Sequence, residues 1–315
     1  MSLFAPVLVT GFNRPELLEV QLKSLIKIGS KVYVSLDVPK ESDSANAELS
    51  QKCIAIVNRF SDDLFDVRIS KENLGSFRGV TEGITWGFSR ETKLIILEDD
   101  VFVSEIFLSH ATKLLMIFES NKSIGSVAGT NFVPKSHITL NASPVRLSAF
   151  TSSWGWATWS DRWDDYLQDL TTFPIHDYVF PTNFWSWKSK RYWDKVFEAT
   201  VHGKYDAWDY RWLYSNWKRR RLTVVPNSNL VMNVGFGEGA THTTDTKLPW
   251  WLPREIDDSY NLGTIPLLAN RDERADRWAE ENHYRTKVRQ QLRSVLSTKF
   301  PITAETYRRL TGRSE

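Results

Sequence analysis

The first 130 residues alternate short β-branched runs with longer amphipathic segments, and no other feature restricts the fold as much. The short runs predict strands, and segments with apolar residues every three to four positions predict helices. The expected strands are 6–10, 31–36, 65–69, 93–97 and 124–128, and the expected helices are 16–28, 45–60, 76–89 and 105–120. Alternation of this kind, with nearly continuous apolar strands, predicts an α/β fold with a mostly parallel sheet covered by helices on both faces.

Polar residues stand where the expected strands end. Because carboxyl ends of parallel strands meet at one edge, where α/β proteins bind ligands, we expect these residues to converge in one crevice. They are Asn13 and Arg14 after the first strand, Asp37 after the second, Asn73 and Gly75 after the third, and Glu98 to Asp100 after the fourth.

The fourth of these strands ends in three consecutive acids, Glu98, Asp99 and Asp100. Adjacent carboxylates at the end of a buried strand repel one another and are costly to desolvate. A hard divalent cation such as Mg²⁺ or Mn²⁺, completed by substrate phosphates, would offset that cost. The alternative is that the acids cap the next helix, where backbone N–H groups favour negative charge.

Composition narrows the class of protein. The chain has 315 residues, 41% of them hydrophobic, so it can bury a large core in one domain or two closely packed ones. Its 40 basic and 38 acidic residues produce no global field that would attract nucleic acid. A single cysteine, Cys53, excludes an internal disulfide. Without a leader or an apolar stretch of about 20 residues, we expect a cytoplasmic protein with no transmembrane segment.

The character of the chain changes near residue 146. Of its 14 tryptophans, ten lie between Trp154 and Trp217, a density that suits a core or flat surfaces for sugars. We expect a strand at 146–150, helices at 156–166, 184–201 and 208–220, a strand at 222–226, a glycine-rich loop at 229–244, an irregular segment at 256–268 and a charged helix at 272–296. The last helix would pack on the body or support an oligomer.

Six motifs in order resemble those of GT-A glycosyltransferases, particularly N-acetylglucosaminyltransferase I and its bacterial relatives. They are VLVTGFNRP (7–15), VSLDVP (34–39), LEDDVFVSEIFL (97–108), SSWGW (152–156), AWDYRW (207–212) and NVGFGEGATH (233–242). The resemblance implies a Rossmann-like GT-A fold with a nucleotide-sugar half at 1–130, an aromatic-rich acceptor and catalytic half at 131–250, and a C-terminal helical extension at 251–315.

The resemblance also implies roles for the crevice residues. The donor site would comprise Thr10, Asn13, Arg14, Asp37, Asn73, Glu98 and Asp99. Arg14 would contact the nucleotide phosphates or ribose, since a guanidinium fork fits a diphosphate; otherwise it is a surface residue before a helix that starts at Pro15. Asp37 would accept from uracil N3–H, which favours a UDP-sugar, or else forms a turn before Pro39.

The same pattern makes Asp100 the direct ligand of Mn²⁺ or Mg²⁺ and brings His242 to the metal or diphosphate, unless that histidine is structural. Asp209 would be the base that deprotonates the acceptor hydroxyl, with Asp206 in reserve, or would instead cap the next helix. The motif differs from the relatives here, because Tyr210 replaces a second acid.

The acceptor side would use Trp154, Gly155 and Trp156 as a turn and sugar platform, while most other tryptophans belong to the core. These roles predict a metal-dependent, inverting hexosyl- or N-acetylhexosaminyltransferase. Its donor would be a nucleoside-diphosphate sugar, with UDP as the expected nucleotide, and its acceptor would be a carbohydrate hydroxyl. A retaining transferase, a nucleotidyltransferase and a catalytically silent carbohydrate- or nucleotide-binding protein of the same fold are the alternatives.

Overall fold

The computed structural model describes residues 3–139, 143–171, 187–235, 252–253, 255–265 and 270–284, without the side chains of residues 168, 170 and 171. Predictions for His242, for most of the glycine-rich loop and for the chain beyond residue 284 lie outside these ranges. No helix in the described ranges is long and apolar enough to cross a membrane.

The first half follows the predicted alternation. Strands β1 (Val7–Gly11), β2 (Val32–Leu36), β3 (Asp66–Ile69) and β4 (Lys93–Glu98) alternate with helices α1 (Pro15–Lys27), α2 (Ser44–Arg59) and α3 (Gly75–Phe88). Pro15 starts α1 at a position where no backbone N–H is needed, and Asp43 caps α2 by accepting from the Asn46 amide. All four strands are parallel, so their carboxyl ends share one edge.

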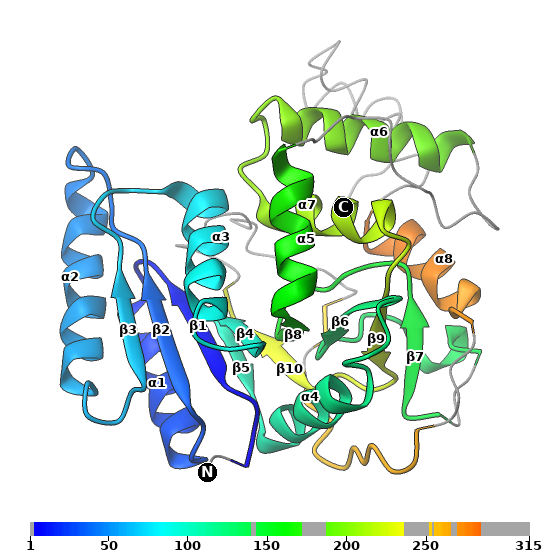
Figure 1. Cartoon of the computed structure of the whole chain (residues 1–315), viewed down its shortest axis with the longest axis horizontal. Coiled ribbons are helices and arrows are strands. Elements are labelled where there is room, and N and C mark those ends of the chain that lie inside the picture. The colour runs from blue at the N-terminus through cyan, green and yellow to red at the C-terminus, as the bar shows by residue number, and fades with distance from the viewer. Residues whose placement is uncertain are drawn as a thin grey trace, which may run out of the picture.

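The second half continues the same sheet. Its elements are β5 (Val101–Val103), α4 (Glu105–Ile117), β6 (Ile124–Ala128), a 3₁₀ turn (Lys135–His137), β7 (Val145–Ser148), β8 (Trp156–Trp159), α5 (Ser160–Thr171), α6 (Trp187–Val201), α7 (Trp208–Lys218), β9 (Leu222–Pro226), β10 (Val231–Asn233) and α8 (Glu273–Asn282). In the described residues, eight strands form one sheet in the order β3-β2-β1-β4-β8-β6-β9-β7, in which only β8 and β7 run against the others. The predicted α/β class with a mostly parallel sheet is confirmed (Figure 1).

Alternate residues of each strand face opposite helical layers. Val7 and Val9 of β1 pack with α1, α2 and α4, whereas Leu8 between them packs with α3, α5 and α7. Both sets are fully buried, which explains why these strands are apolar throughout rather than alternating with polar residues. A third apolar cluster joins α6, α7 and α8 at the far end of the sheet.

Two predictions for the second half are wrong in detail. The predicted helix at 156–166 begins only at Ser160, because Trp156–Trp159 form the central antiparallel strand β8 between β4 and β6. The predicted loop at 229–244 contains β10, which pairs with β5 in a small separate sheet. Of the predicted helix at 272–296, residues Glu273–Asn282 form α8, and the part beyond residue 284 lies outside the described residues. Each strand of the small sheet has three residues, too short for a periodic signal.

Candidate functional site

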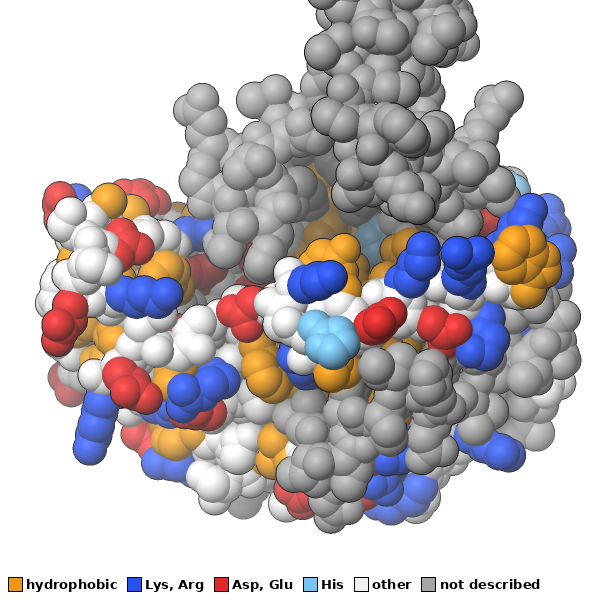
Figure 2. Space-filling view, turned by 90° about the horizontal axis from the view of Figure 1, so that it is seen from above, with side chains coloured by type: hydrophobic (Ala, Val, Ile, Leu, Met, Phe, Trp, Pro, Cys, Tyr) orange, Lys and Arg blue, Asp and Glu red, His pale blue; other side chains and the backbone are white. Residues whose placement is uncertain are grey.

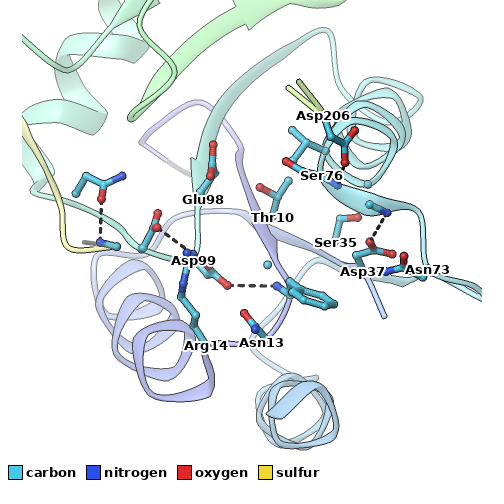
Figure 3. Close-up of a pocket in the computed structure, with 18 of the residues that line it drawn as sticks. Thr10, Asn13, Arg14, Ser35, Asp37, Asn73, Ser76, Glu98, Asp99 and Asp206 are labelled. Carbon is cyan, nitrogen blue, oxygen red and sulfur yellow. Dashed lines mark hydrogen bonds and ion pairs between the residues drawn. The ribbon is translucent and has the colours of Figure 1, made fainter. Parts of the chain in front are cut away.

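A pocket of about 380 Å³ opens at the carboxyl ends of β1, β2 and β4. Several predicted donor-site residues line it, contributed by segments far apart in the chain (Figure 3). They are Thr10, Asn13, Arg14, Asp37, Asn73, Glu98 and Asp99, joined by the predicted metal ligand Asp100 and, from the second half, by Trp154, Asp206 and Gly235. The predicted convergence on one crevice is therefore observed.

The three acids end β4 at Glu98 and continue through Asp99 and Asp100, which form the tight connection to β5. Asp99 and Asp100 are 3% and 5% exposed, so both carboxylates are buried. The Arg14 guanidinium lies between them, 2.7 Å from Asp99 Oδ1 and 2.9 Å from Asp100 Oδ2. The Phe12 backbone amide donates to Asp99 Oδ2 at 3.2 Å. Three acids therefore face one half-buried guanidinium, which leaves the cluster with excess negative charge when its carboxyl groups are ionised.

This imbalance shifts the acids toward their protonated forms. Burial, followed by the charges of Asp100 and Asp99, raises the pKa of Glu98 to about 8. Burial and the neighbouring Asp99 likewise raise the pKa of Asp100 to about 6, against the opposing effect of Arg14. Burial raises the pKa of Asp99 as well, although Arg14 opposes it. Arg14 alone does not compensate the cluster, so a further cation would be stabilised here.

Asp100 has the features of a cation ligand. Its Oδ1 atom is buried and has no hydrogen-bond partner among the described residues, which is costly for a carboxylate. The backbone of Gly235 approaches the same group so closely that a Cβ there would lie 1.9 Å from Asp100 Oδ2. The Val234 amide donates to the Asp100 carbonyl at 2.9 Å, which keeps the Gly235 segment beside the acids.

The residues present fit a hard divalent cation that shares its coordination with a substrate. In the described part of the chain, no group of three or more His, Cys, Asp or Glu residues is arranged to hold a metal ion unaided. Mg²⁺ typically binds through one or two carboxylates, with water and substrate phosphates completing the shell. Asp100 Oδ1 can supply such an oxygen. His242 was predicted as a second ligand and lies outside the described residues.

Gln21 is a residue of this site that the sequence reasoning missed. It lies on α1, is 2% exposed, and its Nε2 donates to the Glu98 carbonyl at 2.9 Å and to the Val101 carbonyl at 2.6 Å. One side-chain amide thus holds both ends of the acidic turn. A glutamine inside an amphipathic helix has no distinctive sequence signal, so only the tertiary contact identifies this role.

Asp37 is held by the loop that precedes α3. Its carboxylate accepts from the backbone amides of Val38 at 2.9 Å, Leu74 at 3.1 Å and Gly75 at 3.1 Å. Burial raises its pKa, and these amides oppose the shift. Asn73 Nδ2 donates to the Val38 carbonyl at 2.7 Å, which ties the same two loops together. Asp37 therefore organises the turn and also lines the pocket, so its two predicted roles are compatible.

The two candidate bases occupy different places. Asp206 lines the pocket and accepts from the Ser76 and Phe77 amides at 3.0 and 3.2 Å, so it caps α3 and lies beside Ser76 (Figure 3). Asp209, in the first turn of α7, accepts from the Tyr210 amide at 2.9 Å. The charge of Asp209 contributes to the raised pKa of Glu98, which places it within electrostatic reach of the acid cluster.

The predicted acceptor platform divides into two parts. Trp154 lines the pocket and is half-buried, with its carbonyl accepting from Thr130 Oγ1 at 2.6 Å. Trp156 is 1% exposed and stacks on Trp208 with ring centroids 5.3 Å apart. Its indole packs in the core and presents no face for a sugar, which corrects the prediction for this residue. Gly155 has a φ of +60°, which favours glycine at the turn between them.

No family model and no curated protein matches the chain. Solved structures with a similar backbone include the mannosyltransferase PcManGT from Pyrobaculum calidifontis in complex with GDP-Man and Mn²⁺ (TM-score 0.36, 14% identity, 65% of this chain and 66% of that chain). They also include S. aureus TarS (0.40, 11%, 72% and 36%) and GalNAc-T7 with UDP, GalNAc and Mn²⁺ (0.42, 10%, 71% and 42%). The chain thus matches about two thirds of the first protein and less than half of the other two. These likenesses are distant, and the residue roles below rest on the geometry of this chain.

Proposed function

We propose that the protein is a metal-dependent glycosyltransferase that takes a sugar from a nucleoside-diphosphate sugar, with UDP as the expected nucleotide, and transfers it with inversion to a carbohydrate hydroxyl. The observation that carries this proposal is the buried turn Glu98–Asp100. It lies at the ligand-binding edge of a parallel sheet and has more negative charge than Arg14 compensates. Among the described residues, one buried carboxylate oxygen of Asp100 has no hydrogen-bond partner.

Several pocket residues have roles under this proposal. Asp100 would hold the cation, while Arg14 keeps Asp99 and Asp100 in place and offers a guanidinium to the diphosphate. Asp37 and Asn73 would border the nucleotide base, because both line the pocket beside β2 rather than beside the acids. The bound cation would neutralise the departing diphosphate and so make it a better leaving group.

Transfer with inversion requires a group that takes the acceptor proton while the hydroxyl attacks the anomeric carbon. Asp209 is the proposed base, because it lies in the first turn of α7, three residues after the pocket-lining Asp206, and its charge contributes to the raised pKa of Glu98. Asp206 is a weaker candidate, because its carboxylate already accepts two backbone hydrogen bonds from α3. Trp154 supplies an indole at the pocket wall for the acceptor sugar.

The proposal is tested by offering a panel of nucleotide-sugars with Mn²⁺, with Mg²⁺ and with a chelator, and measuring released nucleotide in the presence and absence of saccharide acceptors. We expect one donor to be consumed only when a divalent ion is present. The anomeric configuration of the product, read by NMR, distinguishes inversion from retention. Tight nucleotide binding without release from any donor would instead support the silent binding protein.

Substitution of Asp209 tests the assignment of the base. The Asp209→Asn variant should bind donor with unchanged affinity while turnover falls by at least ~10²-fold, because an amide takes up no proton at neutral pH. Asp206→Asn serves as the matched control on the same segment and should retain more turnover. If Asp206→Asn is the inactive variant and Asp209→Asn is not, the role belongs to Asp206.

A further inference from the structure

Helix α6 presents a basic outer face that the proposed transfer reaction does not use. The inner face packs into the protein through Trp193, Val196 and Phe197, all buried. Between residues 187 and 205 the sequence has five Lys or Arg residues against two acids, in a chain whose overall formal charge is only +2. The cationic side chains are Lys188, Lys190, Arg191, Lys195 and Lys204. Local charge is therefore concentrated on this one face.

The basic residues lie in a row and are accessible. Trp187, Arg191 and Lys195 follow one another at intervals of four, so they project from the same side of the helix. Arg191, Lys195 and Lys204 are exposed and form no ion pair within the described residues, whereas Lys190 pairs with Asp194. Figure 2 looks onto the side of the molecule where α6 lies in Figure 1 and shows a row of Lys and Arg side chains across it.

Exposed hydrophobic side chains flank this row. Trp187 at its start is 68% exposed, and Val201 and Tyr205 at its other end are 37% and 48% exposed. Exposed indole and phenol rings beside Lys and Arg are typical of surfaces that settle at the level of lipid headgroups. Clusters of four to eight basic residues of this kind bind anionic lipid through charge.

We propose that the outer face of α6, with residues 202–205, docks the protein on an anionic membrane surface. The row of cations would contact lipid phosphates, and Trp187 and Tyr205 would enter the headgroup layer. Asp206 of the pocket follows Tyr205 directly, so the docked face adjoins the wall of the candidate site. A soluble polyanion is the competing partner, and a convex helix face with aromatic residues at its two ends favours the flat lipid surface over it.

Vesicle flotation tests this proposal with the full chain. The protein should float with vesicles that contain about 30 mol% phosphatidylglycerol in phosphatidylcholine and remain behind with phosphatidylcholine alone, and salt should weaken the binding. The combined variant Arg191→Gln, Lys195→Gln, Lys204→Gln should bind about a hundredfold more weakly, at about fivefold for each charge. Trp187→Ala should lower binding to the same vesicles by about tenfold.

The matched control removes the same number of charges from the opposite end of the molecule. Lys23, Lys52 and Arg59 on α1 and α2 have side chains 61%, 54% and 57% exposed, and their combined change to Gln should leave flotation nearly unchanged. Thermal unfolding verifies that both triple variants are folded. The proposal is overturned if wild type does not float with anionic vesicles, if the control loses as much binding, or if dextran sulfate binds the face while vesicles do not. None of these outcomes depends on glycosyl transfer.

Discussion

Asp100 shows how a single residue can be kept in a position that the fold alone disfavours. Its burial beside Asp99 raises its pKa to about 6, so the ionised form is less favourable in the folded protein than in the unfolded chain. A bound cation would remove that penalty. The residue therefore opposes stability in the metal-free protein and supports binding in the loaded one.

The Asp100→Asn variant separates these two effects. We expect metal-dependent nucleotide affinity to fall by at least ~100-fold, because the variant lacks the charged carboxylate whose oxygen would bind the metal. The melting temperature of the metal-free variant should equal or exceed that of wild type at pH 7, because a buried negative charge has been removed. Calorimetry and thermal unfolding measure the two quantities. Unchanged affinity for nucleotide with Mn²⁺ would show that Asp100 is not the ligand.

Gln21 acts on the site only through the backbone of the acidic turn. Gln21→Met keeps the side-chain length and removes both donated hydrogen bonds, so metal-dependent affinity should fall by about tenfold. The matched control is Thr158→Val, which removes a buried hydrogen bond to the Gly125 carbonyl away from the site. Both variants should lose ~1–3 kcal/mol of stability, and only Gln21→Met should lose affinity. If the two variants have equal metal-dependent nucleotide affinity, Gln21 has only a structural role.

At the scale of elements, α8 is held against β7 by a buried acid. Asp276 accepts from Ser148 Oγ at 2.5 Å and from the Ala149 amide at 2.9 Å, and it is 2% exposed. Burial raises its pKa from 3.8 to about 6, against the hydrogen bonds and the charges of Arg271 and Arg146.

The end of α8 continues into His283, which stacks on Phe132 with ring centroids 4.1 Å apart, and Phe132 contacts Trp154 of the pocket. The stability of α8 thus bears on the pocket wall.

The raised pKa of Asp276 implies a stability that depends on pH. The folded protein binds this proton more tightly than the unfolded chain does. The stabilisation from protonated Asp276 is therefore complete below about pH 4 and is lost as the pH rises through about 6. About two pH units correspond to ~3 kcal/mol. Measured by urea unfolding, the free energy of unfolding of the Asp276→Asn variant should rise by about that much relative to wild type between pH 4 and pH 7. The control is Glu273→Gln, which changes an exposed acid of α8. If the stability difference between Asp276→Asn and wild type is the same at pH 4 and pH 7, the assignment is contradicted.

At the scale of the whole molecule, the second half completes a site that begins in the first. The pairing of β10 with β5 brings Gly235 to Asp100, and Asp206, just before α7, caps α3. Trp154 reaches the same pocket from the connection that leads into β8. A ligand that contacts these walls binds only the folded chain and should stabilise it as a unit.

Thermal unfolding with ligands measures this coupling. Mn²⁺ and UDP together, at about 100 times their dissociation constant, should stabilise the fold by about 2.7 kcal/mol, while neither alone should do so at the same concentrations. The cation and diphosphate complete each other's coordination, which is why both are needed. The Asp100→Asn variant provides the control. Full stabilisation by UDP without a divalent ion would show that the site does not use a metal.

Sequence reasoning succeeded where the signal is local. Strand–helix alternation predicted the first half of the fold, since apolar strands and amphipathic helices leave periods that are readable within one segment. It also predicted which polar residues meet, because parallel topology places all carboxyl ends at one edge. It was wrong at Trp156, where a run of aromatic residues suits a buried strand as well as a helix, and only the pairing with β4 and β6 decides.

The amino-acid sequence by itself determined the α/β class, the crevice and the acids within it, because these depend on local periodicity and on residues next to strand ends. The tertiary structure alone decided that Gln21 holds the acidic turn, that Asp206 caps α3, that Trp156 is core, and that α6 turns its cations outward. Those roles depend on contacts between segments up to 130 residues apart, as between Ser76 and Asp206, and such contacts leave no local pattern in the chain.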